Sequence, residues 1–267
     1  MKKNNFTTIK LAKGEMNIYD FGELKLHLYK TNDAFTDVVL LLQKKNNLIA
    51  IEQPNFVDNI KELTQYIKDI GGIFKGKILA YHNSGTSFFP ADPVYSTKNA
   101  EDYAVNGGGK ILVDNFVKNF GSQFDGSLCK ITNYIDSDHI IIDGIEMKII
   151  KTPEAFDIEF PEINSIYIHI LGHDCHSIIP NEAGLNAIII QLKKLIQANY
   201  DLIFTSHYPA ENIEDVKTKI AYLEYAREAA VQSKSAEEFR SKMKKKYSEY
   251  SGDYYLNMTS EFLFPVK

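Results

Sequence analysis

The alternation of apolar and polar residues predicts short strands at the start of the chain, followed by a helix. Four runs rich in Val, Ile, Leu and aromatic residues are separated by polar turns: Asn17–Phe21, Leu24–Tyr29, Val38–Gln43 and Leu48–Glu52. From Pro54 to Gly72 the apolar residues instead recur every three or four positions, which predicts an amphipathic helix. The pattern then predicts a strand over Lys77–Tyr81 and a second helix over Gly109–Phe120.

The second part of the chain repeats this order. Its predicted strands are Leu128–Tyr134, His139–Asp143, Glu146–Lys151, Ser165–Leu171 and Leu202–Thr205, and its predicted helices are Leu185–Asn199, Asn212–Ala230 and Ala236–Tyr247. Two similar halves, each a sheet with helices on one face, indicate an α/β four-layer αββα sandwich. We expect Leu48–Glu52 and Lys77–Tyr81 to share one sheet, and Ser165–Leu171 and Leu202–Thr205 to share the other, with the two sheets facing each other.

Composition narrows the class of protein. The chain has 267 residues, of which 44% are hydrophobic and 24% charged, and no linker rich in Pro, Gly or Ser divides it, so we expect a single domain over residues 1–267. A net charge of -5 disfavours a nucleic-acid or anionic-membrane partner. No apolar stretch resembles a signal peptide or a membrane span, and two cysteines fit a reducing compartment. We therefore expect a cytoplasmic protein that acts on or binds a small molecule.

Three polar clusters follow predicted strands, where α/β proteins commonly place their sites. His82 follows one strand, the segment Gly172–His176 follows another, and His207 follows a third. Imidazole and carboxylate are the usual protein ligands of zinc and iron, so these three loops could converge on one ion. For each residue alone, a surface or packing role is the ordinary alternative. His27 and His169 fall inside predicted strands, which favours packed or surface positions for both.

For the two cysteines and one glycine-rich loop, the sequence favours a structural role over a chemical one. Cys129 is predicted to be a small buried residue. Cys175 could be a metal ligand, a reactive thiol or a packed residue, and packing is favoured because the sequence places no positive charge beside it. The loop 106–110 leads into a helix but lacks the spacing of a phosphate-binding loop, so it is interpreted as a flexible connection.

The order of elements resembles the metallo-β-lactamase superfamily over most of the chain. In that family the second strand ends in an acidic residue, and Glu52 stands in this place. The strand after the helix normally ends in His-x-His-x-Asp-His, the main metal-binding motif. Here the segment reads His82-Asn83-Ser84-Gly85-Thr86-Ser87, so that only His82 matches.

The later motifs of the family match this sequence better than the His82 segment does. The segment Gly172-His173-Asp174 is similar to a strand end whose Asp bridges two metals, and His207 is similar to the last metal-binding His. The family's middle His has no counterpart between Ile149 and Pro161. The resemblance thus implies His82, Asp174 and His207 as metal ligands, with His173 and His176 as additional candidates.

Two functions remain open. A dinuclear site needs about five ligands, so the matching positions imply one zinc or iron ion, or no metal. The first hypothesis is a metal-dependent hydrolase, although Thr86 stands where the family has the Asp that orients the attacking water. The alternative is a non-catalytic small-molecule-binding or regulatory descendant of this fold, its pocket lined by Tyr81, Phe88, Phe89 and Tyr208.

Overall fold

The computed structural model describes residues 2–265, and these residues form two compact units. The first unit consists of the residues up to Ile170 together with Leu202–Ala210. The second consists of Leu171–Asp201 and the residues from Glu211 onward. The strands of the two sheets lie in the first unit, and four of the helices lie in the second.

The first sheet keeps its strands in sequence order. It starts as an antiparallel meander and continues with parallel pairs from β5 to β8. Its strands are β1 (Thr7–Lys10), β2 (Gly14–Asp20), β3 (Leu24–Thr31), β4 (Val38–Lys44), β5 (Asn47–Ile51), β6 (Ile73–Ile78), β7 (Val94–Ser96) and β8 (Asn133–Tyr134).

The second sheet has the order β13-β12-β11-β10-β9 and is antiparallel except for the pair of β12 and β13. Its strands are β9 (His139–Ile142), β10 (Ile145–Lys151), β11 (Phe156–Phe160), β12 (Ser165–Ile168) and β13 (Leu202–Thr205). Strands β12 and β13 are parallel, with Ile168 opposite Thr205. Parallel neighbours end at the same edge of a sheet, so the residues after both strands emerge together.

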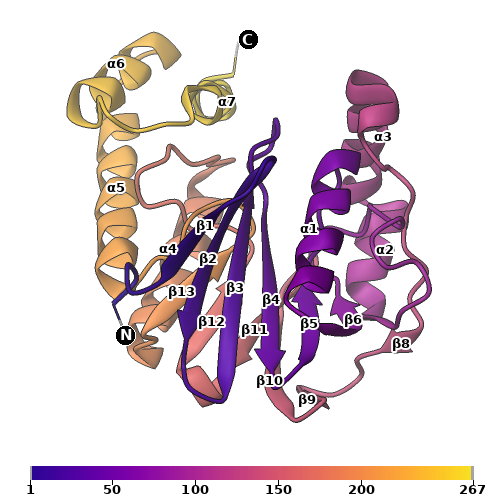
Figure 1. The fold of residues 1–267 in the computed structure, drawn as a ribbon. Coiled ribbons are helices and arrows are strands. Elements are labelled where there is room, and N and C mark those ends of the chain that lie inside the picture. The colour runs from indigo at the N-terminus through magenta and orange to yellow at the C-terminus, as the bar shows by residue number, and fades with distance from the viewer. Residues whose placement is uncertain (1, 266–267) are drawn as a thin grey trace. The chain divides into compact units, whose positions relative to one another are not determined.

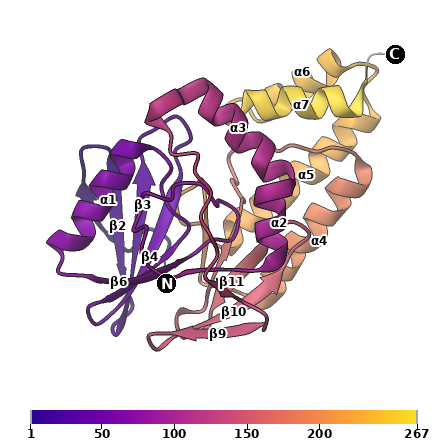
Figure 2. The same cartoon turned by 90° about the vertical axis from the view of Figure 1, so that its right-hand side faces the viewer.

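The main core lies between the two sheets. Alternate residues of β3, β4 and β5 bury Leu28, Leu40 and Ile51 in one cluster with Met147 and Phe156 of the second sheet. The opposite face of the first sheet is covered by α1 (Val57–Asp69), as Figures 1 and 2 show. A fully buried Leu, Ile or Phe side chain contributes roughly 1.5–3 kcal/mol, so these two layers of contact hold the first unit together.

Two further helices and two short 3-10 turns complete the first unit. They are α2 (Lys98–Asn106), α3 (Gly108–Phe120), η1 (Gly121–Gln123) and η2 (Pro161–Ile163). The Thr97 side chain caps α2 by accepting a hydrogen bond from the Ala100 amide. No residue of α3 is buried, and its half-buried Phe116 and Phe120 contact an aromatic cluster.

The second unit is helical in the part that the structure describes. Helix α4 (Glu182–Ala198) packs against α5 (Ile213–Val231), and α6 (Ala236–Lys246) packs against α7 (Asp253–Leu263). Asn212 and Asp215 form a reciprocal capping box that fixes the start of α5. No helix within residues 2–265 is both long and apolar enough to cross a membrane.

The predicted pairing of strands is confirmed, since β5 pairs with β6 and β12 with β13 in two separate sheets that face each other. Three predicted strands reach beyond the observed ones. The strand predicted over Lys77–Tyr81 ends at Ile78. Of Leu128–Tyr134 only Asn133–Tyr134 is a strand, because Leu128 makes just an isolated bridge to Ser84. The strand predicted to reach Leu171 ends at Ile168, where its pairing with β13 ends.

Candidate metal centre

Three imidazole rings meet at one edge of the first unit. His82 follows β6, His169 directly follows β12, and His207 follows β13. One ring nitrogen of each can be chosen so that all three lie within 4.8 Å of one another. The ring centroids are 5.2–5.4 Å apart. We call these residues the histidine trio; the predicted closeness of His82 and His207 is confirmed, and His169 joins them.

Strand pairing brings His169 and His207 together. Because β12 and β13 end side by side at Ile168 and Thr205, the residues that follow them share one edge. The Ser206 amide continues the ladder by donating to the His169 carbonyl at 3.0 Å. The prediction that His169 lies inside a strand is therefore wrong, since β12 ends one residue before it.

Glu52 positions the segment that carries His82. Its carboxylate is buried and accepts hydrogen bonds from three successive amides, those of Ala80, Tyr81 and His82, at 2.8–3.2 Å. It also accepts one from the Tyr167 hydroxyl at 2.9 Å. Glu52 adopts a φ of 62°, a conformation that a non-glycine residue rarely takes and that buried contacts must hold in place. The acidic residue that the sequence placed here thus fixes the backbone before the trio.

His169 has one ring nitrogen that is buried without a partner. Its Nε2 atom has no hydrogen-bond partner among the described residues. The Tyr81 ring stacks on the imidazole at 4.4 Å between centroids. Burial holds the pKa of His169 well below its usual value, and charge on His82 and His207 would lower it further. The ring is therefore neutral, which is the form that binds a metal.

His207 is oriented by a carboxylate. Its Nδ1 atom lies 3.0 Å from Oδ1 of Asp37, a residue that is only 4% exposed. A carboxylate on the second ring nitrogen is the usual companion of a metal-binding His. No motif of the sequence pointed to Asp37, because only the tertiary fold brings the β3–β4 loop beside the end of β13.

In the His82 segment, hydroxyl groups stand where the family has metal ligands, and each hydroxyl donates a hydrogen bond to another part of the protein. Ser84 donates to Asn55 Oδ1 at 3.0 Å, and Thr86 donates to the Ser127 carbonyl at 2.9 Å. Ser87 donates to Asp125. Gly85 between them has a φ of 104°, and a Cβ there would lie 2.6 Å from a carbonyl oxygen. This loop is built as a hydrogen-bonded structural turn.

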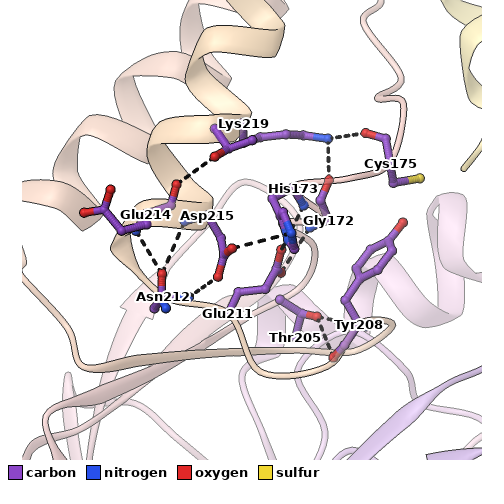
Figure 3. A network of polar contacts seen from close by, with 11 residues as sticks. Gly172, His173, Cys175, Thr205, Tyr208, Glu211, Asn212, Glu214, Asp215 and Lys219 are labelled. Atoms are coloured by element: carbon purple, nitrogen blue, oxygen red, sulfur yellow. Dashed lines mark hydrogen bonds and ion pairs between the residues drawn. The ribbon is translucent and has the colours of Figure 1, made fainter. Parts of the chain in front are cut away.

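The segment Gly172–His176 belongs to the second unit, where it makes a separate network. Glu211 accepts hydrogen bonds from the amides of Gly172 and His173. Figure 3 shows the His173 ring between two carboxylates: Nδ1 lies 2.8 Å from Glu211, and Nε2 lies 3.5 Å from Asp215. The hydrogen bond to Glu211 raises the pKa of His173. Both ring nitrogens thus face carboxylates, which favours the protonated ring over the neutral form that binds a metal, and metal binding by His173 stays a prediction.

The other candidates in this segment have partners within the second unit. His176 is buried, its Nδ1 lies 3.0 Å from the Tyr222 hydroxyl, and burial lowers its pKa. Asp174 is exposed, and its carbonyl accepts from the Ser251 amide. Cys175 is buried, as the packing interpretation predicted, and so is Cys129 in the first unit. Metal binding by Asp174 or His176 stays a prediction.

Comparisons with known proteins agree on the fold. By sequence, the chain matches no family model and no curated protein. By structure, it matches a metallo-β-lactamase family protein from Thermus thermophilus with a TM-score of 0.61 and 11% identity, covering 90% of this chain and 91% of that one. The chain has the metallo-β-lactamase fold. The predicted fold class is thereby confirmed.

Two further matches show how varied proteins of this fold are. A stereoselective inverting sec-alkylsulfatase from Pseudomonas sp. matches with a TM-score of 0.58 and 12% identity over 94% of this chain and 50% of that one. This chain therefore spans about half the length of the sulfatase. A chemotaxis sensor from T. denticola, in its apo state, matches with a TM-score of 0.52 and 10% identity over 79% of this chain and 94% of that one.

Proposed function

We propose that the histidine trio binds one divalent metal ion of the zinc or iron type, and that the protein is a metal-dependent hydrolase. The observation that carries the proposal is the buried Nε2 atom of His169, which has no partner among the described residues although buried polar groups nearly always have one. An ion among the three rings would satisfy that atom. Ligands of one tetrahedral ion lie roughly 3.5 Å apart, so the spacing of at most 4.8 Å needs only small ring movements.

A single ion fits the donor set better than two. Three neutral imidazoles resemble the three-ligand sites that leave one position open for water. A second ion would need donors from the His82 segment, whose hydroxyls of Ser84, Thr86 and Ser87 already donate to other groups. Neutral hydroxyls are poor zinc ligands near neutral pH.

The expected reaction is attack of water on a carbonyl or phosphoryl group. A bound ion would supply water with a lowered pKa and polarise the substrate oxygen. His82, His169 and His207 would hold it as neutral donors, and Asp37 would keep His207 oriented. Because Thr86 cannot accept a proton near neutral pH, we expect slower hydrolysis than in an enzyme that keeps an Asp there.

The test measures metal and activity together. Protein purified without an affinity tag should contain about one zinc, iron or manganese per chain, and nitrophenyl ester hydrolysis should disappear with a chelator and return with the metal. His169→Ala should lose both metal and activity. The control is His139→Ala, because His139 is exposed and pairs with Glu146 away from the trio. Two tightly bound ions per chain, or metal retained by His169→Ala, would contradict the proposal.

The second candidate is a small-molecule-binding or regulatory module without catalysis. The hydrogen bonds of Ser84 and Thr86 favour it, because this loop is organised for structure. Phe88 does not help to form such a pocket, since it is fully buried against Phe74. Normal metal content with no hydrolysis of any ester would favour this module. In either case two buried free thiols support the proposal of a cytoplasmic protein.

A further inference from the structure

The loop between β3 and β4, residues 32–37, lies directly behind His207. The backbone of its last residue, Asp37, is fixed by a hydrogen bond: the Asp37 carbonyl accepts from the Thr31 amide at 2.9 Å. The next amide, that of Val38, donates to the Ser206 carbonyl at 2.6 Å. The buried carboxylate is therefore fixed beside the residue that precedes His207.

This geometry selects one tautomer of His207. An ionised carboxylate can only accept a hydrogen bond, so the Nδ1 atom 3.0 Å from Asp37 must carry the ring proton. In a neutral imidazole the lone pair is then on Nε2. The hydrogen bond also fixes the orientation of the ring, which makes it a better ligand.

The same loop is clamped by aromatic rings. Phe35 contacts four phenylalanines: Phe56, Phe116, Phe120 and Phe124. We call these five residues the phenylalanine cluster. The nearest ring is that of Phe116, on helix α3, with its centroid 4.3 Å from that of Phe35. Asp33 adds rigidity because its carboxylate accepts from the amides of Phe35 and Thr36. The loop that carries Asp37 is thus packed against α3.

We propose that the β3–β4 loop controls the metal affinity of the histidine trio. Asp37 is the positioning residue that keeps Nε2 of His207 unprotonated, and the phenylalanine cluster holds Asp37 in place. A change in the packing of α3 therefore moves Phe35, and through it Asp37 two residues later, and so alters the metal affinity of the trio. This inference rests on the proposed metal site, but its first step concerns the metal-free protein.

The first test is the tautomer of His207, read from the nitrogen chemical shifts of histidine-labelled, metal-free protein. Wild type should show His207 protonated at Nδ1. Asp37→Ala should shift the ring toward protonation at Nε2. Asp20→Asn is the control, because Asp20 is exposed beside the opposite end of β3, where it pairs with Lys25; it should leave the tautomer unchanged. An Nε2-protonated ring in wild type, or no change in Asp37→Ala, would overturn the role of Asp37.

The second test is zinc affinity, measured by competition with a chromophoric chelator. Asp37→Asn should weaken binding about 10–100-fold, and Phe35→Leu about threefold or more although it touches no ligand. Phe89→Leu is the control: Phe89 stacks on Phe74 at 4.0 Å, outside the phenylalanine cluster, and its loss should leave zinc affinity unchanged. Unchanged affinity in Phe35→Leu overturns the clamp. Absence of zinc binding in wild type overturns the proposed function instead, and the tautomer measurement still decides the role of Asp37.

Discussion

Two histidine sites of this protein, the histidine trio and the surroundings of His173, differ in what lies around the rings. In the histidine trio, the buried Nε2 of His169 has no partner among the described residues, and burial lowers the pKa of that ring. In the second unit, His173 lies between Glu211 and Asp215, and its pKa is raised. The first arrangement leaves ring nitrogens for a cation, whereas the second surrounds the ring with negative charge and favours its protonated form.

The difference shows why residue type alone does not identify a metal site. The segment Gly172–His176 offers more ligand-type side chains than the His82 loop, yet Glu211 and Lys219 hold it for a structural purpose. Lys219 is buried and donates to the carbonyls of Gly172 and Cys175, and burial lowers its pKa to about 8. We call Gly172, His173, Glu211, Asp215 and Lys219 the His173 cluster.

The largest effect is expected from removing the central carboxylate of the His173 cluster. Glu211→Ala leaves two amides and the His173 ring without their acceptor, which should destabilise the protein by about 3 kcal/mol in chemical denaturation. Glu214→Ala, at an exposed position in the first turn of α5, should cost less than about 0.5 kcal/mol. Zinc affinity should stay unchanged in both variants. A loss of zinc in Glu211→Ala would mean that the His173 cluster takes part in metal binding and is not purely structural.

A smaller loss is expected at Lys219. Lys219→Met keeps the apolar stem but removes two hydrogen bonds to buried carbonyls, at an expected cost of about 1–3 kcal/mol in unfolding free energy. Lys217→Met, whose ammonium is exposed, serves as the control. Added zinc should stabilise wild type and Lys219→Met equally; restoration of Lys219→Met alone by zinc would mean that this loop binds metal.

The smallest effect is a contrast in pH dependence, measured by thermal unfolding of chelator-treated protein. A raised pKa means that His173 stabilises the fold fully below about pH 6.5 and loses this contribution as pH rises through the folded-state value. His173→Gln should therefore cost more at pH 6 than at pH 9. The lowered pKa of His169 has the opposite sign, because stability is lost as pH falls below about 6.5. His169→Gln should thus make the protein less sensitive to acid, and equal pH profiles for the two variants would contradict the assigned protonation states.

Much of the fold could be predicted from the sequence because its strands have clear apolar patterns. The runs Leu48–Glu52 and Leu202–Thr205 are strongly apolar and bounded by polar turns, and both are strands within one residue of the predicted ends. Strand β11, Phe156–Phe160, alternates apolar and acidic residues, and this alternation is the signal by which the strand could be predicted. The three-residue β7 is too short for any pattern, and tertiary pairing with β6 and β8 makes it a strand.

The site could be predicted only in part. His82 and His207 were found because each follows a strand. His169 was missed because the apolar run continues to Leu171, so the sequence alone does not show that β12 ends at Ile168. Asp37 could not be found, since its partner lies 170 positions later in the chain and only the fold brings them together.

The most direct test of the central claim is a zinc competition titration of three matched variants, His169→Ala, His173→Ala and Asp174→Ala, alongside wild type. We predict one zinc per wild-type chain, at least about 100-fold weaker binding in His169→Ala, and wild-type affinity in His173→Ala. Asp174→Ala decides whether the ligand implied by the family resemblance adds to the trio. Wild-type affinity in His169→Ala, or a large loss in His173→Ala, would place the metal in the second unit and contradict the account.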